Sequence, residues 1–592
     1  MQAGSASGAS GGGNRSAKKW GPIVGVVAVL AIVVGVLIAT RHSGSSTKPA
    51  DTGATSTTAA PGGVTTTPGT QGGSTTTAAA KPITYPLSYS QAKAQGVADQ
   101  IDWGTRCDTT TGRLAVPDYF APECYAPFKG DNGGATYAGV TADTINIVFY
   151  EGMANDPIIA YITDAIKVSD TNAQAADTMK ELVRYYETYY ELYGRKVNLI
   201  PYEGTGIATD EVAARADAAA IVEKYQPFVV FGGPALTSAF ADELAARKTM
   251  CVGCTPGQPD DFYTKRDPYV WGLDGSAVQK QTHVIEFIQK QLLGKNAVHG
   301  GDAVKNTPRK FGLLYLESSG AAKDLANQFS AKMTAMGAPL AATVAYQLDP
   351  STIQATASQV ITKMKAAGVT TIVFSGDPVA PRDFTKEATA QEYFPEWVVA
   401  ASTLVDVTAF ARTYDPQQWK HAFGVTQLSA RSDPTTSGAY SVYKWFTGKE
   451  PPAKDTIGVI APNPALFFAV LQYLGPDLTP QNFKAALFAA PGTTPGISQP
   501  YLSYGDKGYW GGVPDYQGVD DATVFWWDPV ATGPDEIRKQ GTGMYQYVDG
   551  GKRYLPGQWP TEDKLFDPNG AVDIYLTPPP GEQPKQYPSP AG

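Results

Sequence analysis

Four cysteines are the side chains with the most distinctive chemistry in this chain of 592 residues. Cys251 and Cys254 form a C-x-x-C motif, a spacing found in redox-active and metal-binding sites. A loop rich in Pro and Gly follows the motif, whereas redox-active pairs usually open a helix that stabilises the thiolate. Cys107 and Cys124 lack the close spacing that would complete a zinc site. We therefore expect two structural disulfides, Cys107–Cys124 and Cys251–Cys254, with redox chemistry or metal binding as the alternatives.

The loop Gly232 to Ser238 is a second candidate, because an apolar run ends there and a helical pattern begins. Free backbone N–H groups at such a turn attract carboxylates and other oxyanions, and Thr and Ser can cap the helix. The sequence thus predicts a loop that binds an anionic or polar group. Its candidate residues are Gly233, Pro234, Ala235, Thr237 and Ser238. An ordinary capped turn would have the same sequence.

Charged residues follow two other apolar runs. Glu151 comes after one run, and Asp377 and Arg382 come after another. If the two runs belong to facing sheets, these groups could hold a zwitterion, bridge one another, or stay solvated.

Several classes of function find no support in the sequence. The chain has 47 Lys and Arg against 56 Asp and Glu, a net charge of -9, which argues against a nucleic-acid partner. It contains no H-E-x-x-H and no G-x-x-x-x-G-K-[ST] motif, and its G-x-S-x-G match at residues 8–12 lies in a low-complexity segment. We expect neither an enzyme nor a bound cofactor or metal.

The beginning of the chain has the pattern of a membrane protein. Residues 21–40 are uncharged and long enough to cross a bilayer, and Arg15, Lys18 and Lys19 precede them. This predicts a cytoplasmic tail (1–20), a transmembrane anchor (21–40) and an extracytoplasmic remainder, with a cleaved signal peptide as the alternative. Residues 41–82 are rich in Ser, Thr, Gly and Pro and read as a linker, and residues 546–592 read as a tail.

Between these ends, short β-branched runs alternate with helical patterns, which predicts parallel sheets covered by helices on both faces. The expected strands are 144–150, 196–202, 228–233, 310–316, 342–347, 370–376 and 397–401. The expected helices are 177–193, 211–225, 237–248, 279–293, 321–336 and 351–367. Ligands of open α/β sheets bind at the carboxyl ends of the strands.

The ordered motifs resemble the leucine/isoleucine/valine-binding-protein family, which has the type I periplasmic-binding fold. GVTADTINIVFYEG (139–152) and QPFVVFGGPALTSAFADEL (226–244) are similar to its first lobe, and RKFGLLYLESSGAAKDLANQFSAKMTAMG (309–337) to its second. The resemblance implies lobe 1 at 137–272 and 436–500, and lobe 2 at 273–435 and 501–545. An N-terminal extension at 83–136 would carry one disulfide.

The resemblance also implies site residues. The loop at Gly233 would hold a ligand carboxylate, Cys254 and Thr255 would lie in a second ligand loop, and Glu151 and Asp377 would face the same crevice. On the lobe 2 side, the ligand positions correspond to Ser318, Ser319 and Thr403. The family commonly has an aromatic residue where this chain has Ser319, and an acidic residue near Thr403, where the chain has Asp406 instead. These departures argue against a free branched-chain amino acid.

The function implied is a membrane-anchored, extracytoplasmic solute receptor that captures a small polar ligand, amino-acid-like or amide-like, between two closing lobes. Its partners would be the ligand and the membrane subunits of an ABC-type importer. The alternative is a cell-envelope scaffold protein that uses the same fold with a degenerate cleft.

Overall fold

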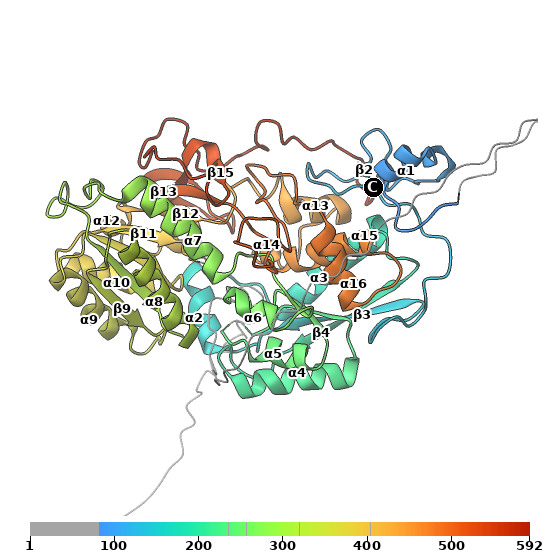
Figure 1. Cartoon of the computed structure of the whole chain (residues 1–592), viewed down its shortest axis with the longest axis horizontal. Helices are drawn as coiled ribbons and strands as arrows, with labels where there is room; N and C mark the ends of the chain where they lie inside the picture. The colour runs from blue at the N-terminus through green and yellow to red at the C-terminus, as the bar shows by residue number, and fades with distance from the viewer. Residues whose placement is uncertain (1–81, 235, 256, 319, 403) are drawn as a thin grey trace, which may run out of the picture.

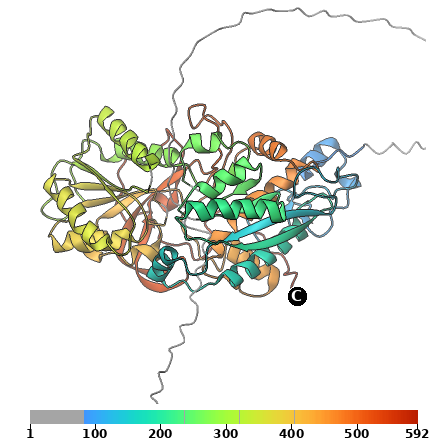
Figure 2. The same cartoon turned by 90° about the horizontal axis from the view of Figure 1, so that it is seen from below.

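The computed structural model describes residues 82–592 except residues 235, 256, 319 and 403. Two α/β bodies lie side by side (Figures 1 and 2). We call the body around the five-stranded sheet lobe 1 and the body around the eight-stranded sheet lobe 2. The fold class is therefore mixed α/β with parallel sheets, as predicted. The predicted cytoplasmic tail, membrane span and nearly all of the linker lie outside the described residues.

Lobe 1 contains a parallel sheet with the strand order β4-β3-β5-β6-β7. Its strands are β3 (Thr144–Glu151), β4 (Lys196–Glu203), β5 (Val229–Phe231), β6 (Met250–Val252) and β7 (Val270–Trp271). The helices between them are α2 (Pro157–Ile166), α3 (Asn172–Tyr189), α4 (Glu211–Tyr225), α5 (Ala239–Ala246) and α6 (Asp260–Thr264). Four later helices join them: α13 (Gly438–Thr447), α14 (Ile457–Ile460), α15 (Pro462–Leu474) and α16 (Pro480–Ala489). A continuous hydrophobic core connects this sheet to every one of these helices except α2.

Lobe 2 contains a sheet with the order β14-β13-β12-β11-β10-β8-β9, in which β8 to β12 run parallel and β13 and β14 form an antiparallel hairpin at one edge. Its strands are β8 (Phe311–Leu316), β9 (Ala342–Tyr346), β10 (Thr371–Ser375), β11 (Glu396–Ala400), β12 (Ala422–Thr426), β13 (Ala522–Pro534), β14 (Gln540–Tyr547) and β15 (Arg553–Tyr554), which pairs with β13. Helices α7 (Ala277–Phe287) and α8 (Gly320–Ala335) cover one face. Helices α9 (Ile353–Ala366), α10 (Ala380–Ala390), α11 (Thr408–Ala411) and α12 (Pro416–Trp419) cover the other.

The chain passes between the lobes three times before it enters β13. It leaves lobe 1 after β7, returns after β12, and leaves again after α16. Because two of these passages follow the carboxyl ends of strands, the carboxyl ends of both sheets face the junction between the lobes. This is the edge at which open α/β sheets bind ligands.

The two terminal segments of the described chain meet on lobe 1. The N-terminal extension contains α1 (Tyr89–Gln95), β1 (Cys107–Asp108) and β2 (Arg113–Leu114), and its apolar residues join the lobe 1 core. Residues 546–592, which the sequence predicts as a tail, are instead packed: Trp559 and Leu565 are buried against lobe 2. The end of the chain, residues 576–592, then returns to lobe 1, and we call it the C-terminal strap (Figure 1).

All seven predicted strands and six predicted helices are present, with shifts at their ends. Helix α2 was not predicted, although Asp156 caps its first turn and Pro157 is its first residue, a common combination at helix starts. The predicted packing of the aromatic residues of 501–554 against lobe 2 holds for Trp527, Tyr545 and Tyr547. Tyr504 and Tyr516 instead belong to the core of lobe 1. Within the described residues, one apolar helical stretch, Ile457–Leu474, could cross a membrane by length and composition, and half of it is buried inside the protein.

Candidate ligand-binding site

The loops after β5 and β6 meet at the carboxyl edge of the lobe 1 sheet. The backbone N–H of Gly232 donates to the Val252 carbonyl at 3.1 Å. A Cβ atom on Gly233 would lie 2.8 Å from the carbonyl oxygen of Cys254. Only glycine permits this approach. The two loops to which the resemblance assigns ligand contacts are therefore neighbours.

One of the two hydroxyls predicted for the first loop bonds to the helix that follows. Thr237 is buried, and its Oγ1 accepts a hydrogen bond from the Ala239 N–H at 3.1 Å, whereas Ser238 makes no capping hydrogen bond through its side chain. Pro234 is buried in the loop, and Ala235 lies outside the described residues. The loop thus has the geometry of a capped turn, which leaves its role in ligand binding a prediction.

Glu151 ends β3 beside Glu203, its register partner at the end of β4. Burial raises the pKa of the Glu151 carboxyl to about 8, and the negative charge of Glu203 adds to this. Its Oε1 is buried and has no hydrogen-bond partner among the described residues. Without a ligand this group is therefore largely protonated at neutral pH, and its role in ligand binding stays a prediction.

Both predicted disulfides are present, and none of the cysteines is free. The Cα atoms are 5.7 Å apart in Cys107–Cys124 and 5.9 Å apart in Cys251–Cys254. Thr255 is buried beside the second disulfide, and its carbonyl accepts a hydrogen bond from the Tyr263 hydroxyl at 2.8 Å. The C-x-x-C motif therefore shapes the loop after β6.

Asp377, after β10, is directed into lobe 2 rather than into open space. Its Oδ2 accepts from the Tyr346 hydroxyl at 2.6 Å, and its Oδ1 accepts from the N–H groups of Val379 and Ala380 at 2.9 Å. Burial raises the pKa of this carboxyl, while these hydrogen bonds lower it. The side chain caps the start of α10. On the same edge, Ser318 is exposed, and Ser319 and Thr403 lie outside the described residues.

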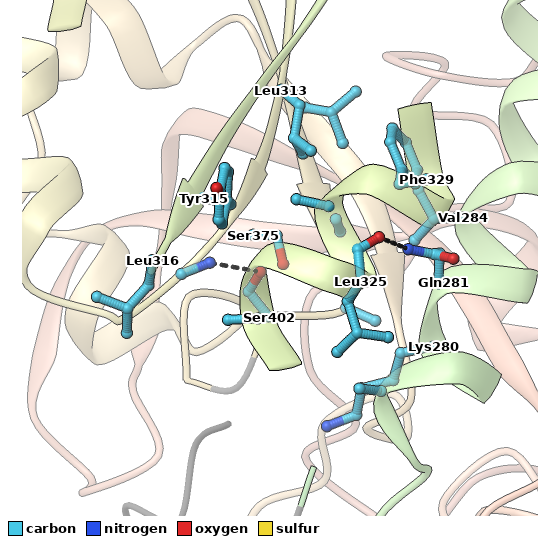
Figure 3. Close-up of a pocket in the computed structure, with 17 residues that line it drawn as sticks. Lys280, Gln281, Val284, Leu313, Tyr315, Leu316, Leu325, Phe329, Ser375 and Ser402 are labelled. Atoms are coloured by element: carbon cyan, nitrogen blue, oxygen red, sulfur yellow. Dashed lines mark hydrogen bonds between the residues drawn. The ribbon is translucent and has the colours of Figure 1, made fainter. Parts of the chain in front are cut away.

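A pocket lies in lobe 2 at the carboxyl ends of β8, β10 and β11, between α7 and α8 (Figure 3). Its cavity volume is about 90 Å³, and it opens to solvent. Its wall is mainly apolar, with Val284, Leu313 and Phe329 among the lining residues. The polar lining includes the hydroxyls of Ser375 and Ser402, and Ser402 Oγ accepts from the Gly376 N–H at 3.3 Å.

Charged groups border this pocket on one side. Lys280 of α7 lines it and pairs with Asp274, which lies in the first passage between the lobes. Asp406 is buried close enough to interact with both: burial raises its pKa to about 7, Lys280 opposes this rise and Asp274 adds to it. Asp406 Oδ2 accepts from the Thr426 hydroxyl at 2.5 Å, while Oδ1 has no partner among the described residues.

None of the predicted site residues that the structure describes lines this pocket. The lining residues nevertheless stand next to them in sequence, since Gly376 precedes Asp377 and Ser402 precedes Thr403. Sequence reasoning named residues next to these strand ends of lobe 2, but it did not name Lys280 and Phe329, which line the pocket from helix faces. The signal in the sequence was the apolar spacing of α7 and α8, which equally indicates helices that pack against the hydrophobic core. The described residues contain no group of three or more His, Cys, Asp or Glu side chains that could hold a metal ion.

Comparisons with known proteins give similarity in structure only. No family model matches the chain, and no curated protein matches its sequence. Solved structures that it resembles include a solute-binding protein of an ABC transporter from Rhodopseudomonas palustris in complex with 4-hydroxybenzoate, 12% identical, with a TM-score of 0.46 over 70% of this chain and 99% of that one. A branched-chain amino acid ABC transporter periplasmic ligand-binding protein from Burkholderia xenovorans is 13% identical, with a TM-score of 0.47 over 70% and 96% of the two chains. A Leu-, Ile-, Val-, Thr- and Ala-binding protein from Brucella ovis, in a closed conformation, is 12% identical, with a TM-score of 0.47 over 73% and 100%.

Proposed function

We propose that this protein is an extracytoplasmic solute receptor that binds a small molecule in the lobe 2 pocket. The observation that carries the proposal is the position of the pocket at the carboxyl ends of β8, β10 and β11, on the edge that faces lobe 1. Ligand sites of open α/β folds occur at this edge. The lining residues belong to lobe 2, so this pocket does not depend on the ligand contacts predicted for lobe 1.

The lining indicates a ligand with an apolar body and one polar or anionic group. Val284, Leu313 and Phe329 would contact the body, and the hydroxyl of Ser375 could donate to or accept from the polar group. The Lys280 ammonium has three N–H donors, so it can contact an anionic group while it stays paired with Asp274. Amino acids with apolar side chains and small aromatic or aliphatic acids fit this description.

Membrane attachment and delivery to an ABC-type importer complete the proposal. They are supported by the uncharged residues 21–40 and by the resemblance of the lobes to the solute receptors of such importers. If residues 21–40 form an anchor, the protein should remain with membranes after a carbonate wash and should keep its N-terminus.

Filling the pocket tests the proposal. Ala326 of α8 lines the pocket, whereas Ala331 of the same helix is exposed. A library of amino acids, amides, and aromatic and aliphatic acids should contain compounds that raise the melting temperature in a concentration-dependent way, because only the folded state binds them. The Ala326→Phe variant should lose this rise, and the control Ala331→Phe should keep it. A library without any stabilising compound, or a rise that Ala326→Phe leaves intact, would contradict the proposal.

A scaffold without a ligand is the second candidate, and one observation favours it. Helix α2, which belongs to lobe 1 in sequence, contributes apolar residues to the core of lobe 2. The space between the lobes is therefore partly filled by the chain itself. If no compound stabilises the protein and pocket variants keep their cellular phenotype, the scaffold is the better description.

A further inference from the structure

Helix α2 lies between the two lobes (Figure 1). It follows β3 of lobe 1, and its N-terminus is held there: Asp156 accepts from the N–H groups of Ile158 at 2.8 Å and Ala208 at 2.5 Å. Ala208 in turn accepts, through its carbonyl, from the Leu236 N–H at 3.0 Å. The helix thus starts from the same loops that form the lobe 1 side of the junction.

The body of the helix packs on lobe 2 instead of lobe 1. Ile159 and Ile162 are 1% and 2% exposed, and both belong to the hydrophobic cluster of lobe 2. The same cluster includes Val379, at the start of α10, and Phe410 of α11. Apolar side chains of lobe 1 are therefore removed from water only when lobe 2 covers them.

Polar contacts fasten the same junction in the middle of α2 and at its C-terminal end. The Arg382 guanidinium of α10 contacts the Tyr161 hydroxyl, and its Cζ lies 5.1 Å from the centre of the Tyr161 ring. At the C-terminal end, the Lys539 ammonium donates to the carbonyls of Ile166 and Lys167 at 2.7 and 2.9 Å. Lys539 lies at the tip of the β13–β14 hairpin of lobe 2.

The hairpin tip also reaches lobe 1 beyond α2. Arg538 forms an ion pair with Asp455 at 2.5 Å and donates to the Lys454 carbonyl at 2.9 Å. Asp170, just after α2, accepts from the N–H groups of Asp455 and Thr456. Helix α2, the segment after it and the hairpin tip consequently form one contact region between the lobes.

We propose that the contacts of α2 with both lobes hold the lobes together in the protein without any ligand. We call α2 in this role the wedge. A two-lobed receptor whose closed state depends on its ligand needs bridging contacts from that ligand. Here the chain supplies the bridge through Ile159, Ile162 and Tyr161. A ligand can then enter or leave the lobe 2 pocket without a large change in the angle between the lobes. This inference goes beyond the proposed function and does not depend on it.

Hydrogen exchange of the full chain without ligand tests the wedge. We expect the amides of α2 and those of residues 404–411, which the cluster places against it, to be protected in the unaltered protein. In the double variant Ile159→Ala/Ile162→Ala, both segments should exchange at least about tenfold faster, and they should do so together, because one contact protects both.

A matched control is available in lobe 1. Ile457 and Ile460 of α14 have the same spacing and are 2% and 1% exposed, but they lie in the core of lobe 1 alone. The double variant Ile457→Ala/Ile460→Ala should leave exchange in α2 and in residues 404–411 unchanged. The wedge is refuted if α2 is unprotected in the unaltered protein, or if the α2 variant accelerates exchange in α2 but not in residues 404–411.

A milder pair of variants decides the matter if the isoleucine variants do not fold. Lys539→Met removes an exposed lysine that donates to the last carbonyls of α2. Lys365→Met removes an exposed lysine that donates to the carbonyl of Gln391, at the end of α10 and within lobe 2. Faster exchange at both α2 and residues 404–411 in the first variant only would support the wedge. Equal exchange in the two variants would refute it.

Discussion

At the scale of single residues, buried carboxyl groups gather near the passages between the lobes. Asp406 has already been described, and Asp515 and Asp520 lie on the third passage, 4% and 0% exposed. Burial raises the pKa of both, to about 6 for Asp520, and the charge of Asp520 raises that of Asp515 further. Protonation of such groups favours the folded state, because their pKa is higher there than in the unfolded chain. The free energy of unfolding should therefore fall as the pH rises, which the sequence alone does not reveal.

The Asp406→Asn variant isolates one of these groups. Between the ordinary pKa of an aspartate, about 4, and the raised value of about 7, the folded protein holds a proton that the unfolded chain releases. The free energy of unfolding should then fall with rising pH by up to about 1.4 kcal/mol per unit, and level off above pH 7. Asn does not titrate, so the variant should lose this slope. Urea denaturation at several pH values from 4.5 to 8, with exposed Asp302→Asn as control, measures it, and parallel curves would contradict the assignment.

The cysteines give a second prediction at this scale. Because both pairs are disulfides, maleimide should label no cysteine in denaturant without reductant and four after reduction. Intact mass spectrometry counts the additions. Two labels before reduction would mean that one pair is a dithiol and would restore the redox or metal alternative for that pair.

At the scale of elements, the first residue of β11 connects three segments of lobe 2. Glu396 is fully buried and accepts from the Arg309 guanidinium at 2.8 and 3.0 Å, from the Thr371 hydroxyl at 2.6 Å and from the His299 N–H at 3.1 Å. Its four hydrogen bonds join the start of β10 to the segment before β8. A buried carboxylate that loses its cation is costly.

Arg309→Met should therefore destabilise the protein strongly, by about 3–5 kcal/mol, because it leaves the Glu396 charge buried without a counter-ion. Lys265→Met is a suitable control, since Lys265 forms an exposed pair with Asp261 of α6 and its loss should cost no more than about 0.5 kcal/mol. Denaturant unfolding compares the two. Similar losses in both variants would show that the buried pair has no special role.

The extent to which the sequence predicts this fold also differs between elements. The apolar runs of β3, β8 and β10 are nearly continuous, which is typical of strands buried on both faces, and their positions were predictable. Helix α2 was missed although its Asp–Pro start is typical of a helix, and only the tertiary structure shows that its apolar residues pack on the other lobe. For the site, turn chemistry correctly marked the strand ends, but only the tertiary structure shows that Asp377 caps α10 and that Lys280 reaches the pocket.

At the scale of the whole molecule, the C-terminal strap joins the far side of lobe 1 to lobe 2. Tyr575, just before the strap, donates through its N–H to the Arg431 carbonyl at 2.8 Å in the second passage. Further along, Lys585 and Tyr587 both donate to Asp108, and the Trp445 indole N–H donates to the Tyr587 carbonyl at 2.9 Å. The Lys585 ammonium holds the pKa of Asp108 well below its usual range.

Removal of residues 581–592 should lower the free energy of unfolding by about 1–3 kcal/mol while the fold is kept, because the strap lies outside both cores. The contribution of Asp108 is present above its unfolded pKa of about 4 and is lost as the pH falls below that value. The truncated and intact chains should thus differ less at pH 3 than at pH 7, as measured by denaturant unfolding. A Lys585→Met/Tyr587→Phe variant separates the side-chain contacts from the backbone of the strap. A difference that does not shrink at low pH would contradict the role of Asp108.

The strap meets the N-terminal extension at Asp108, which accepts a hydrogen bond from the Tyr587 hydroxyl. Both terminal segments of the described chain are therefore attached to lobe 1. Any surface that holds the protein by either end would also hold it by lobe 1, and lobe 2 with its pocket would point away.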